Sequence, residues 1–155
     1  MEIYKEGNIE GVTIKELRFF NDARGWLAEL YRTDELPDGL TPVMSYVSMT
    51  KPGVARGPHE HVDQTDIFIF LTNFTLYLWD RRENSPTYKN RIVLRDSKNK
   101  IVTVPPGVVH AYKNADNVDG MVINLPDRLY AGKGKKEPVD EIRWEDTDDS
   151  PYKLD

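Results

Sequence analysis

Short runs of β-branched, aliphatic and aromatic residues alternate along the chain with glycine, proline, asparagine and aspartate. In Thr75–Trp79 this alternation has a period of two, which places Leu76 and Leu78 on one side of an extended segment and Tyr77 and Trp79 on the other. No segment has the 3.6-residue apolar repeat of a long amphipathic helix. The pattern therefore predicts an all-β sandwich or barrel. The predicted strands are Val12–Phe20, Trp26–Tyr31, Met44–Met49, Ile67–Leu71, Thr75–Trp79, Arg91–Leu94, Ile101–Val104, Ala111–Lys113 and Met121–Leu125.

Composition changes after residue 130. The segment 131–155 is rich in acidic residues, contains two prolines and has few aliphatic side chains, so it cannot form a core of its own. We predict one β domain over residues 1–130, followed by an irregular C-terminal tail, 131–155, that packs on the domain or is partly disordered.

The chain has 155 residues, which is enough for one domain of ordinary size. Its net charge of −5 disfavours a nucleic-acid or acidic-membrane partner. The absence of cysteine excludes disulfides, thiolate metal sites and cysteine nucleophiles. No apolar run approaches the roughly 18 residues of a membrane span, and the first residues lack the apolar region of a signal peptide. We expect a cytoplasmic protein.

The chain contains three histidines, His59, His61 and His110. His59 and His61 are two residues apart, and on an extended segment such residues point to the same side, so both imidazoles could face one cavity. His110 follows a proline- and glycine-containing turn later in the chain.

These histidines resemble the two sequence motifs of the cupin superfamily. In the first motif, Gly53, His59 and His61 match, Asp66 stands where glutamate is expected, and Asn73 stands where glycine is expected. The second motif is matched in full by Pro105, Gly107, His110 and Asn114. The resemblance implies a cupin double-stranded β-helix, which is a jelly-roll barrel.

Two interpretations of the histidines stay open. His59, His61, His110 and Asp66 could bind one divalent ion such as Fe, Mn, Ni or Zn. Alternatively, they are polar groups of a metal-free pocket, as in many cupins. Aspartate at position 66 is shorter by one methylene than the glutamate of the motif, which favours the second interpretation.

Four further blocks resemble the dTDP-4-dehydrorhamnose 3,5-epimerases, and they occur in that family's order. They are Asp22–Glu29 (DARGWLAE), Arg56–His59 (RGPH), Asp80–Thr87 (DRRENSPT) and Pro106–Tyr112 (PGVVHAY). The resemblance implies a cofactor-independent epimerase or isomerase of a dTDP-4-keto-6-deoxyhexose, active in carbohydrate biosynthesis as a homodimer that exchanges N-terminal strands.

The same resemblance implies roles for individual residues. His59 takes the position of the catalytic base, and Arg56 that of the diphosphate-binding arginine, whose planar fork suits phosphate. The side chains expected near the substrate are Arg24, Trp26, Glu29, His110 and Asn124. Two of these have alternatives, since Trp26 could be a core or interface aromatic and Arg24 a turn residue paired with Asp22.

The chain departs from the epimerase pattern at three places. Asn124 stands where the family has its acid tyrosine, and Thr65 or Asp66 stands where it has a lysine. The family's late aspartate, which pairs with the base, lies in a segment beyond the last residue of this chain. We expect Asp63 or Asp66 to replace that aspartate.

Two tyrosines are candidates for the missing acid. Tyr77 and Tyr112 lie on predicted strands that we expect to line the pocket, although either could be an ordinary barrel tyrosine. The pair of His59 and His61 also resembles the G-x-H-x-H pair of related 3,4-ketoisomerases, in which both histidines move protons.

Three function hypotheses follow. The first is a cofactor-independent nucleotide-sugar epimerase or isomerase that uses His59 as its base. The second is a metal-dependent cupin with a three-histidine site. The third is a carbohydrate- or nucleotide-sugar-binding protein that keeps the pocket but lacks the acid.

Overall fold

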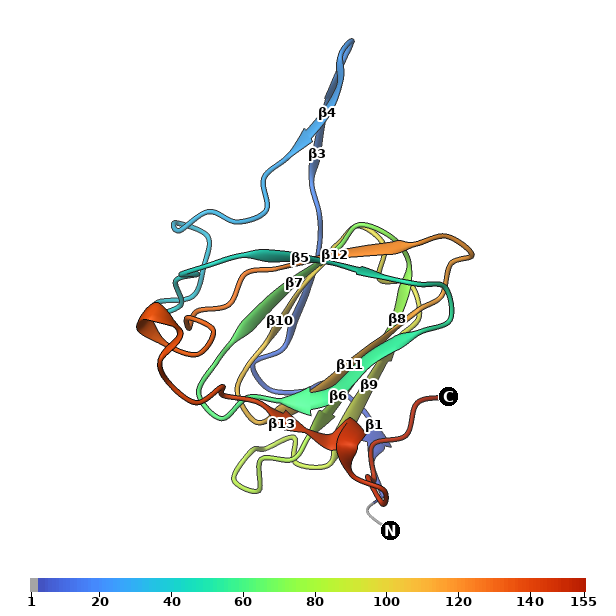
Figure 1. Ribbon diagram of the computed structural model, residues 1–155. Coiled ribbons are helices and arrows are strands. Elements are labelled where there is room, and N and C mark those ends of the chain that lie inside the picture. Colours follow the sequence, from blue (N-terminus) through green and yellow to red (C-terminus); the bar gives the residue numbers. More distant parts are fainter. Residues whose placement is uncertain (1–2) are drawn as a thin grey trace.

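Two facing β-sheets form the body of the protein in a computed structural model, which describes residues 3–155 (Figure 1). The first sheet has the order β1 (Lys5–Glu6), β9 (Asn90–Leu94), β8 (Phe74–Asp80), β11 (Val108–Asn114), β6 (Ala55–Glu60), β13 (Ile142–Arg143). The second has the order β2 (Thr13–Glu16), β10 (Lys100–Val104), β7 (Asp66–Phe70), β12 (Gly120–Asn124), β5 (Tyr46–Thr50). Apart from the parallel β1–β9 pair, neighbouring strands are antiparallel. The predicted all-β jelly roll is thus confirmed.

The main core lies between the two sheets. Leu76 and Leu78 of β8 meet Phe68 and Phe70 of β7 there, and all four side chains are buried. The period of two predicted for Thr75–Trp79 is therefore present, and it also decides where Tyr77 lies. Tyr77 points to the outer face of β8, where it packs with Trp79 and with residues of the C-terminal segment.

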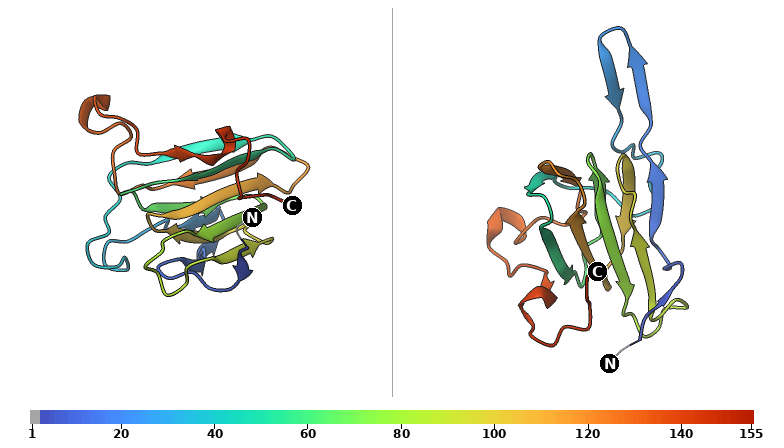
Figure 2. Two further views of the ribbon diagram at one scale, coloured as in Figure 1. Left: turned by 90° about the horizontal axis from the view of Figure 1, so that it is seen from below. Right: turned by 90° about the vertical axis from the view of Figure 1, so that its right-hand side faces the viewer.

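Several strand predictions need correction. The run Val12–Phe20 is divided into β2 and β3 (Phe19–Asp22), and β3 pairs with β4 (Gly25–Ala28) in a hairpin that projects from the body (Figures 1 and 2). The predicted strands leave out everything between Met49 and Ile67, but β6 (Ala55–Glu60) lies there.

Gly57 explains why β6 is difficult to predict. It has a φ of +83°, and a Cβ atom at this position would lie 2.5 Å from the carbonyl oxygen of His110. Glycine is therefore required here to bring β6 and β11 together, although the same glycine lowers the strand propensity of the segment.

The C-terminal segment 131–155 lies along the body (Figure 2). It contains two 3₁₀ turns, η1 (Lys133–Lys135) and η2 (Trp144–Asp146), and between them β13 pairs with β6. Tyr152 is buried against the outer face of the first sheet. The carboxylate of Asp155 pairs with Arg91 and Arg95, at 3.2 and 3.0 Å. No helix within residues 3–155 is long and apolar enough to cross a membrane.

Candidate active site

A cavity of about 970 Å³ opens between the ends of the two sheets and is bordered by the C-terminal segment. Its walls come from β5 and β6, from the interior of β11, and from the segment around β13. Many of its lining side chains are polar or charged, and they include Tyr46, Arg56, His59, His61, Tyr112, Tyr130, Lys133, Glu141, Arg143 and Glu145.

The three histidines lie together beside this cavity, which His59 and His61 line; His110 is almost completely buried and does not line it. His59 on β6 and His110 on β11 are direct partners in the antiparallel pairing, and their rings meet edge to face with 4.5 Å between centroids. His61 follows two residues after His59, and its ring centroid is 5.6 Å from that of His110. The i and i+2 spacing on an extended segment accounts for this convergence.

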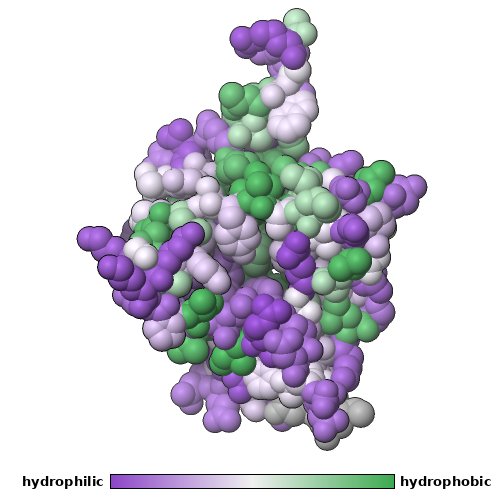
Figure 3. All heavy atoms as spheres, in the orientation of Figure 1, coloured by the Kyte–Doolittle hydropathy of each residue, from purple (hydrophilic) through white to green (hydrophobic). Residues whose placement is uncertain are grey.

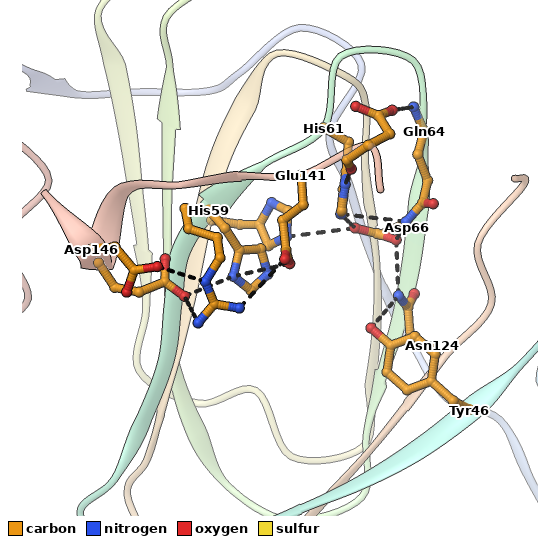
Figure 4. A network of polar contacts seen from close by, with 12 residues as sticks. Tyr46, His59, His61, Gln64, Asp66, Asn124, Glu141 and Asp146 are labelled. Carbon is orange, nitrogen blue, oxygen red and sulfur yellow. Dashed lines mark hydrogen bonds and ion pairs between the residues drawn. The ribbon is translucent and has the colours of Figure 1, made fainter. Parts of the chain in front are cut away.

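Asp66, at the start of β7, connects the histidines to the opposite sheet (Figure 4). Its buried carboxylate accepts hydrogen bonds from Gln64 Nε2 at 2.8 Å, Asn124 Nδ2 at 2.9 Å and His61 Nε2 at 3.0 Å. Burial alone would raise the pKa of Asp66, but the hydrogen bond from His61 and the neighbouring imidazoles lower it to about 2. Asp66 is therefore an anion at neutral pH.

His61 is held as a cation by this arrangement. Burial would lower its pKa, but the hydrogen bond to Asp66 and the charge of Asp66 raise it to about 9. The other ring nitrogen, Nδ1, contacts the backbone carbonyl of Asp140, so both ring nitrogens face acceptors. His61 therefore orients Asp66 and is a poor proton acceptor at neutral pH.

His110 is neutral. It is almost completely buried, and this burial together with the neighbouring His59 lowers its pKa to about 3. Its Nδ1 lies 3.2 Å from the carbonyl oxygen of Val108 and donates to it. Its Nε2 has no hydrogen-bond partner in residues 3–155 and lies 3.5 Å from Asp66 Oδ2.

His59 differs from both. Burial lowers its pKa below the ordinary value, while Glu141 and Glu145 of the C-terminal segment act in the opposite direction. Its Nδ1 makes no hydrogen bond in the described part of the chain and lies 3.7 Å from Glu145 Oε1 and 3.9 Å from Glu141 Oε1. His59 is thus a neutral imidazole with two carboxylates on its Nδ1 side, and both carboxylates also pair with Arg143, at 3.5 and 3.2 Å.

This geometry corrects the expectation that Asp63 or Asp66 replaces the family's late aspartate. Asp66 is bound to His61, and Asp63 pairs with Arg128 at 3.0 Å. The carboxylates near His59 come from the tail, which the sequence pattern did not link to the histidines.

Arg56 lines the cavity beside the histidines. Its Nε donates to Thr50 Oγ1 and its Nη2 to the carbonyl oxygen of Met49, each at 2.8 Å. Both acceptors are neutral, so they orient the guanidinium without neutralising its charge. The remaining donors suit an anionic group.

Arg24, Trp26 and Glu29 lie on or next to the projecting hairpin and do not line the cavity of their own chain. Arg24 forms an ion pair with Asp22 at 2.6 Å, as the turn alternative expected. Trp26 is 63% exposed and packs edge-on against Phe19. One chain therefore does not bring these three predicted substrate-binding residues to the other site residues.

Of the two tyrosines predicted as candidate acids, one lines the cavity and the other does not. Tyr77 lies on the outer face of β8, so its prediction as a pocket-lining acid is wrong. Tyr112 does line the cavity, with its ring packed against Phe68, Phe70 and Phe74. Tyr46 also lines the cavity but was not singled out from the sequence. The only available signal was its place in the predicted strand Met44–Met49.

The block Asp80–Thr87 has a structural role here. The buried carboxylate of Asp80 accepts hydrogen bonds from Arg82 Nε, Ser85 Oγ and Thr87 Oγ1, at 2.8, 2.6 and 2.7 Å. These contacts close the loop after β8. None of the four residues lines the large cavity.

Three of the four predicted metal ligands lie close together. One ligand atom each from His61, Asp66 and His110 lies within 4.8 Å of the others, and the free Nε2 of His110 is a suitable donor. His59 is not part of this group. The direct hydrogen bond between His61 and Asp66 pairs two of these three ligand atoms with each other.

Fold and cavity together define a cupin-type jelly roll whose pocket holds the neutral imidazole of His59 beside Arg56, an arginine that makes no ion pair within residues 3–155. The chain belongs to the dTDP-4-dehydrorhamnose 3,5-epimerase family, whose model matches residues 6–149.

One relative agrees with this assignment, and two solved structures share the fold. The protein named "Probable low-salt glycan biosynthesis epimerase Agl13" of Haloferax volcanii is 34% identical over 127 residues, covering 79% of this chain and 81% of that protein. A dTDP sugar isomerase from Desulfovibrio desulfuricans G20 has a similar fold, with a TM-score of 0.76, 23% identity, and 94% of this chain and 91% of that chain covered. ChmJ, a 3′-monoepimerase from Streptomyces bikiniensis solved with dTDP-quinovose, gives a TM-score of 0.75 at 20% identity, covering 97% of this chain and 82% of that chain.

Proposed function

We propose that the protein is a cofactor-independent epimerase of a dTDP-linked 4-keto-6-deoxyhexose. The observation that carries this proposal is His59, a neutral imidazole in a cavity that also holds the guanidinium of Arg56, which has no carboxylate partner in the described part of the chain. Family membership and the dTDP-sugar complex of ChmJ support the class of substrate.

The chemistry begins with removal of a proton. A carbon next to the C4 ketone is acidic because its carbanion is delocalised onto the ketone oxygen as an enolate. His59 takes this proton through Nε2, since its Nδ1 side faces Glu141 and Glu145. The two carboxylates stabilise the imidazolium that forms, as a carboxylate does behind a histidine base in other enzymes.

Arg56 binds the diphosphate in this proposal. Hydrogen bonds to Thr50 and Met49 fix the direction of its guanidinium before the ligand arrives, which lowers the ordering entropy of binding. The sugar then extends from the diphosphate toward His59.

A test of the proposal follows solvent deuterium. Chelator-treated protein is incubated with dTDP-4-keto-6-deoxyglucose in D₂O, and the C3 and C5 protons are followed by NMR. We expect exchange at one or both carbons in the wild type and no exchange in His59→Ala. Absence of exchange in the wild type, with the substrate shown to bind, would indicate the non-catalytic binding protein.

A metal-dependent cupin is the second candidate, because His61, Asp66 and His110 could ligate a divalent ion. It is tested on the same sample. We expect activity to survive chelation and metal content to stay below one ion per ten chains. Loss of activity with chelator and its return with Fe, Mn, Ni or Zn would favour the metal candidate.

We also propose that the protein is a homodimer. The hairpin of β3 and β4 projects into solvent with Phe20, Trp26 and Leu27 exposed, and apolar side chains gather near its base on the face shown in Figure 3. A second copy of the chain could cover these side chains. Arg24, Trp26 and Glu29 of one chain would then lie near the cavity of the other. A cytoplasmic location stays a prediction from composition.

A further inference from the structure

Inversion of a carbon requires a second group besides the base. His59 can remove a proton from one face of the sugar, but an acid on the other side must return one. The family's acid position is occupied by Asn124, whose carboxamide is not a proton donor of useful acidity. Another side chain near Asn124 must therefore supply the proton.

Tyr46 is the direct cross-strand partner of Asn124. β5 and β12 are antiparallel neighbours, and the pairing places Tyr46 opposite Asn124 on the same face of the sheet. The phenolic oxygen of Tyr46 lies 2.9 Å from Asn124 Nδ2, and the side chain lines the cavity (Figure 4). The hydroxyl group that is absent from β12 is thus present on the adjacent strand.

We propose, on the basis of the epimerase function above, that Tyr46 is the proton donor of the reaction. His59 belongs to the first sheet and Tyr46 to the second, so the two groups approach the cavity from opposing walls. A planar enolate bound between them presents one face to the imidazole and the other to the phenol. That is the arrangement that inversion requires.

The hydrogen-bond network leaves the Tyr46 proton available. Asn124 Nδ2 donates to both the Tyr46 oxygen and Asp66 Oδ1, so Asp66 fixes the direction of the amide. Because the Tyr46 oxygen is an acceptor in this contact, its own O–H can point to a ligand. Burial raises the pKa of Tyr46, which keeps the phenol protonated at neutral pH.

The other tyrosines of the cavity fit the role less well. Tyr112 is on β11, which belongs to the same sheet as His59, and its ring is enclosed by three phenylalanines. Tyr130 lies in a loop beyond β12 and is 57% exposed, against 45% for Tyr46, so its place outside the sheet and not its exposure separates it from Tyr46. Neither hydroxyl is held by a hydrogen bond to Asn124.

The step balances without a cofactor. The C–H bond pair moves into the enolate as His59 gains the proton, and the enolate then forms a new C–H bond with the Tyr46 proton. The phenolate regains a proton from water, and His59 loses its proton to water. No oxidant or reductant is consumed.

The experiment separates proton removal from inversion. Tyr46→Phe, His59→Ala and a control, Tyr77→Phe, are compared with the wild type on dTDP-4-keto-6-deoxyglucose in D₂O. Deuterium wash-in reports proton removal, and the configuration of the labelled carbon reports which face the proton returned to. Tyr77→Phe removes a buried phenol on the outer face, away from the cavity.

For Tyr46→Phe we expect deuterium wash-in within about threefold of the wild type, with epimer formation lower by about 10²–10⁴-fold. The exchanged substrate keeps its configuration, because the base returns the label to the face it came from. Epimer formation near the wild-type rate would overturn the role of Tyr46 and leave the proposed function intact. Equal loss of wash-in and inversion, with an unchanged melting curve, would also overturn it. Absence of wash-in in the wild type would overturn the epimerase function and this role with it.

Discussion

His59 and His61 are separated by one residue, yet their pKa values are shifted in opposite directions. His61 lies between Asp66 and the Asp140 carbonyl and is stabilised as a cation. His59 has carboxylates no closer than 3.7 Å, and burial keeps it neutral. The division of the pair into a cation and a base depends on these neighbours and is not visible in the motif itself.

The tail carboxylates should set the pH range of the reaction. Glu141 and Glu145 raise the pKa of His59 against the effect of burial, so removing their charges lowers that pKa further. In Glu141→Gln/Glu145→Gln, we therefore expect the acid limb of kcat/KM to move to lower pH and the rate at neutral pH to fall by about 10-fold or more, since the imidazolium is less stabilised. A pH–rate profile measures both effects.

The control removes two negative charges from the same segment. Asp148 and Asp149 are exposed and make no contact with the histidines within residues 3–155, so Asp148→Asn/Asp149→Asn should leave the acid limb unchanged. A shift in the control as large as in Glu141→Gln/Glu145→Gln would attribute the effect to net charge and contradict the role of Glu141 and Glu145.

His61 should make stability depend on pH in the alkaline direction. Its folded pKa of about 9 lies above the ordinary value of 6.5. The contribution of protonated His61 to the free energy of unfolding is therefore complete below pH 6.5 and is lost as pH rises through 9. We expect the urea midpoint of the wild type to fall between these values, and that of His61→Gln to be lower at pH 6.5 and flat over the same window. An equally steep fall in the variant would show that another group titrates there.

At the level of strands, the contact between β6 and β11 depends on Gly57. Gly57→Ala introduces a methyl group 2.5 Å from the His110 carbonyl oxygen and also strains a φ of +83°. We expect a loss of about 2–4 kcal/mol in the free energy of unfolding, measured with urea.

Gly53→Ala is the matched control for this effect. Gly53 also has a positive φ, +72°, but a Cβ atom there would meet no atom within 4 Å. Gly53→Ala should lower the free energy of unfolding by only about 1 kcal/mol, through backbone strain. Equal losses in the two variants would indicate that close packing at Gly57 contributes nothing.

Strand patterns predicted the centre of the fold better than its edges. The alternation of Leu76 and Leu78 with Tyr77 and Trp79 is a local property, and it correctly separated the two faces of β8. It did not say which face is the inner one, and Tyr77 was wrongly assigned to the pocket. β6 and β13 were missed because their pairing depends on distant residues, through the Gly57 contact and through the pairing of Arg143 with His59.

The candidate site was predictable to a similar degree. Motif spacing brought His59, His61 and His110 to one place, since the two motifs lie on paired strands. The partners of these histidines were not predictable, because Glu141, Glu145 and Tyr46 are placed by tertiary packing. No local pattern links the tail to the base.

For the molecule as a whole, the projecting hairpin predicts self-association. Exposed Trp26 and Leu27 lie near its tip, in the chain as the structure describes it. We expect the protein to elute as a dimer in size-exclusion chromatography with light scattering. Trp26→Asp/Leu27→Asp should shift it to a monomer and, because Arg24, Trp26 and Glu29 then lack a second cavity, raise KM more than it lowers kcat.

An exposed apolar residue elsewhere provides the comparison. Val118 is 56% exposed and lies outside the hairpin, so Val118→Asp should stay dimeric. A wild-type monomer at micromolar concentration, or a dimer that survives the double hairpin substitution, would exclude the hairpin as the dimer contact.

The position of the tail on the barrel has a consequence for how such proteins diverge. The strands that carry His59 and Asp66 also build the barrel, so changes there disturb folding. Glu141 and Glu145 instead lie on a segment whose residues between 131 and 146 are mostly outside the core. Substitutions in this segment can alter the base while leaving the scaffold intact. Mutation of a short peripheral segment is therefore an accessible route, in evolution or in directed selection, to a different pH range of activity on an unchanged scaffold.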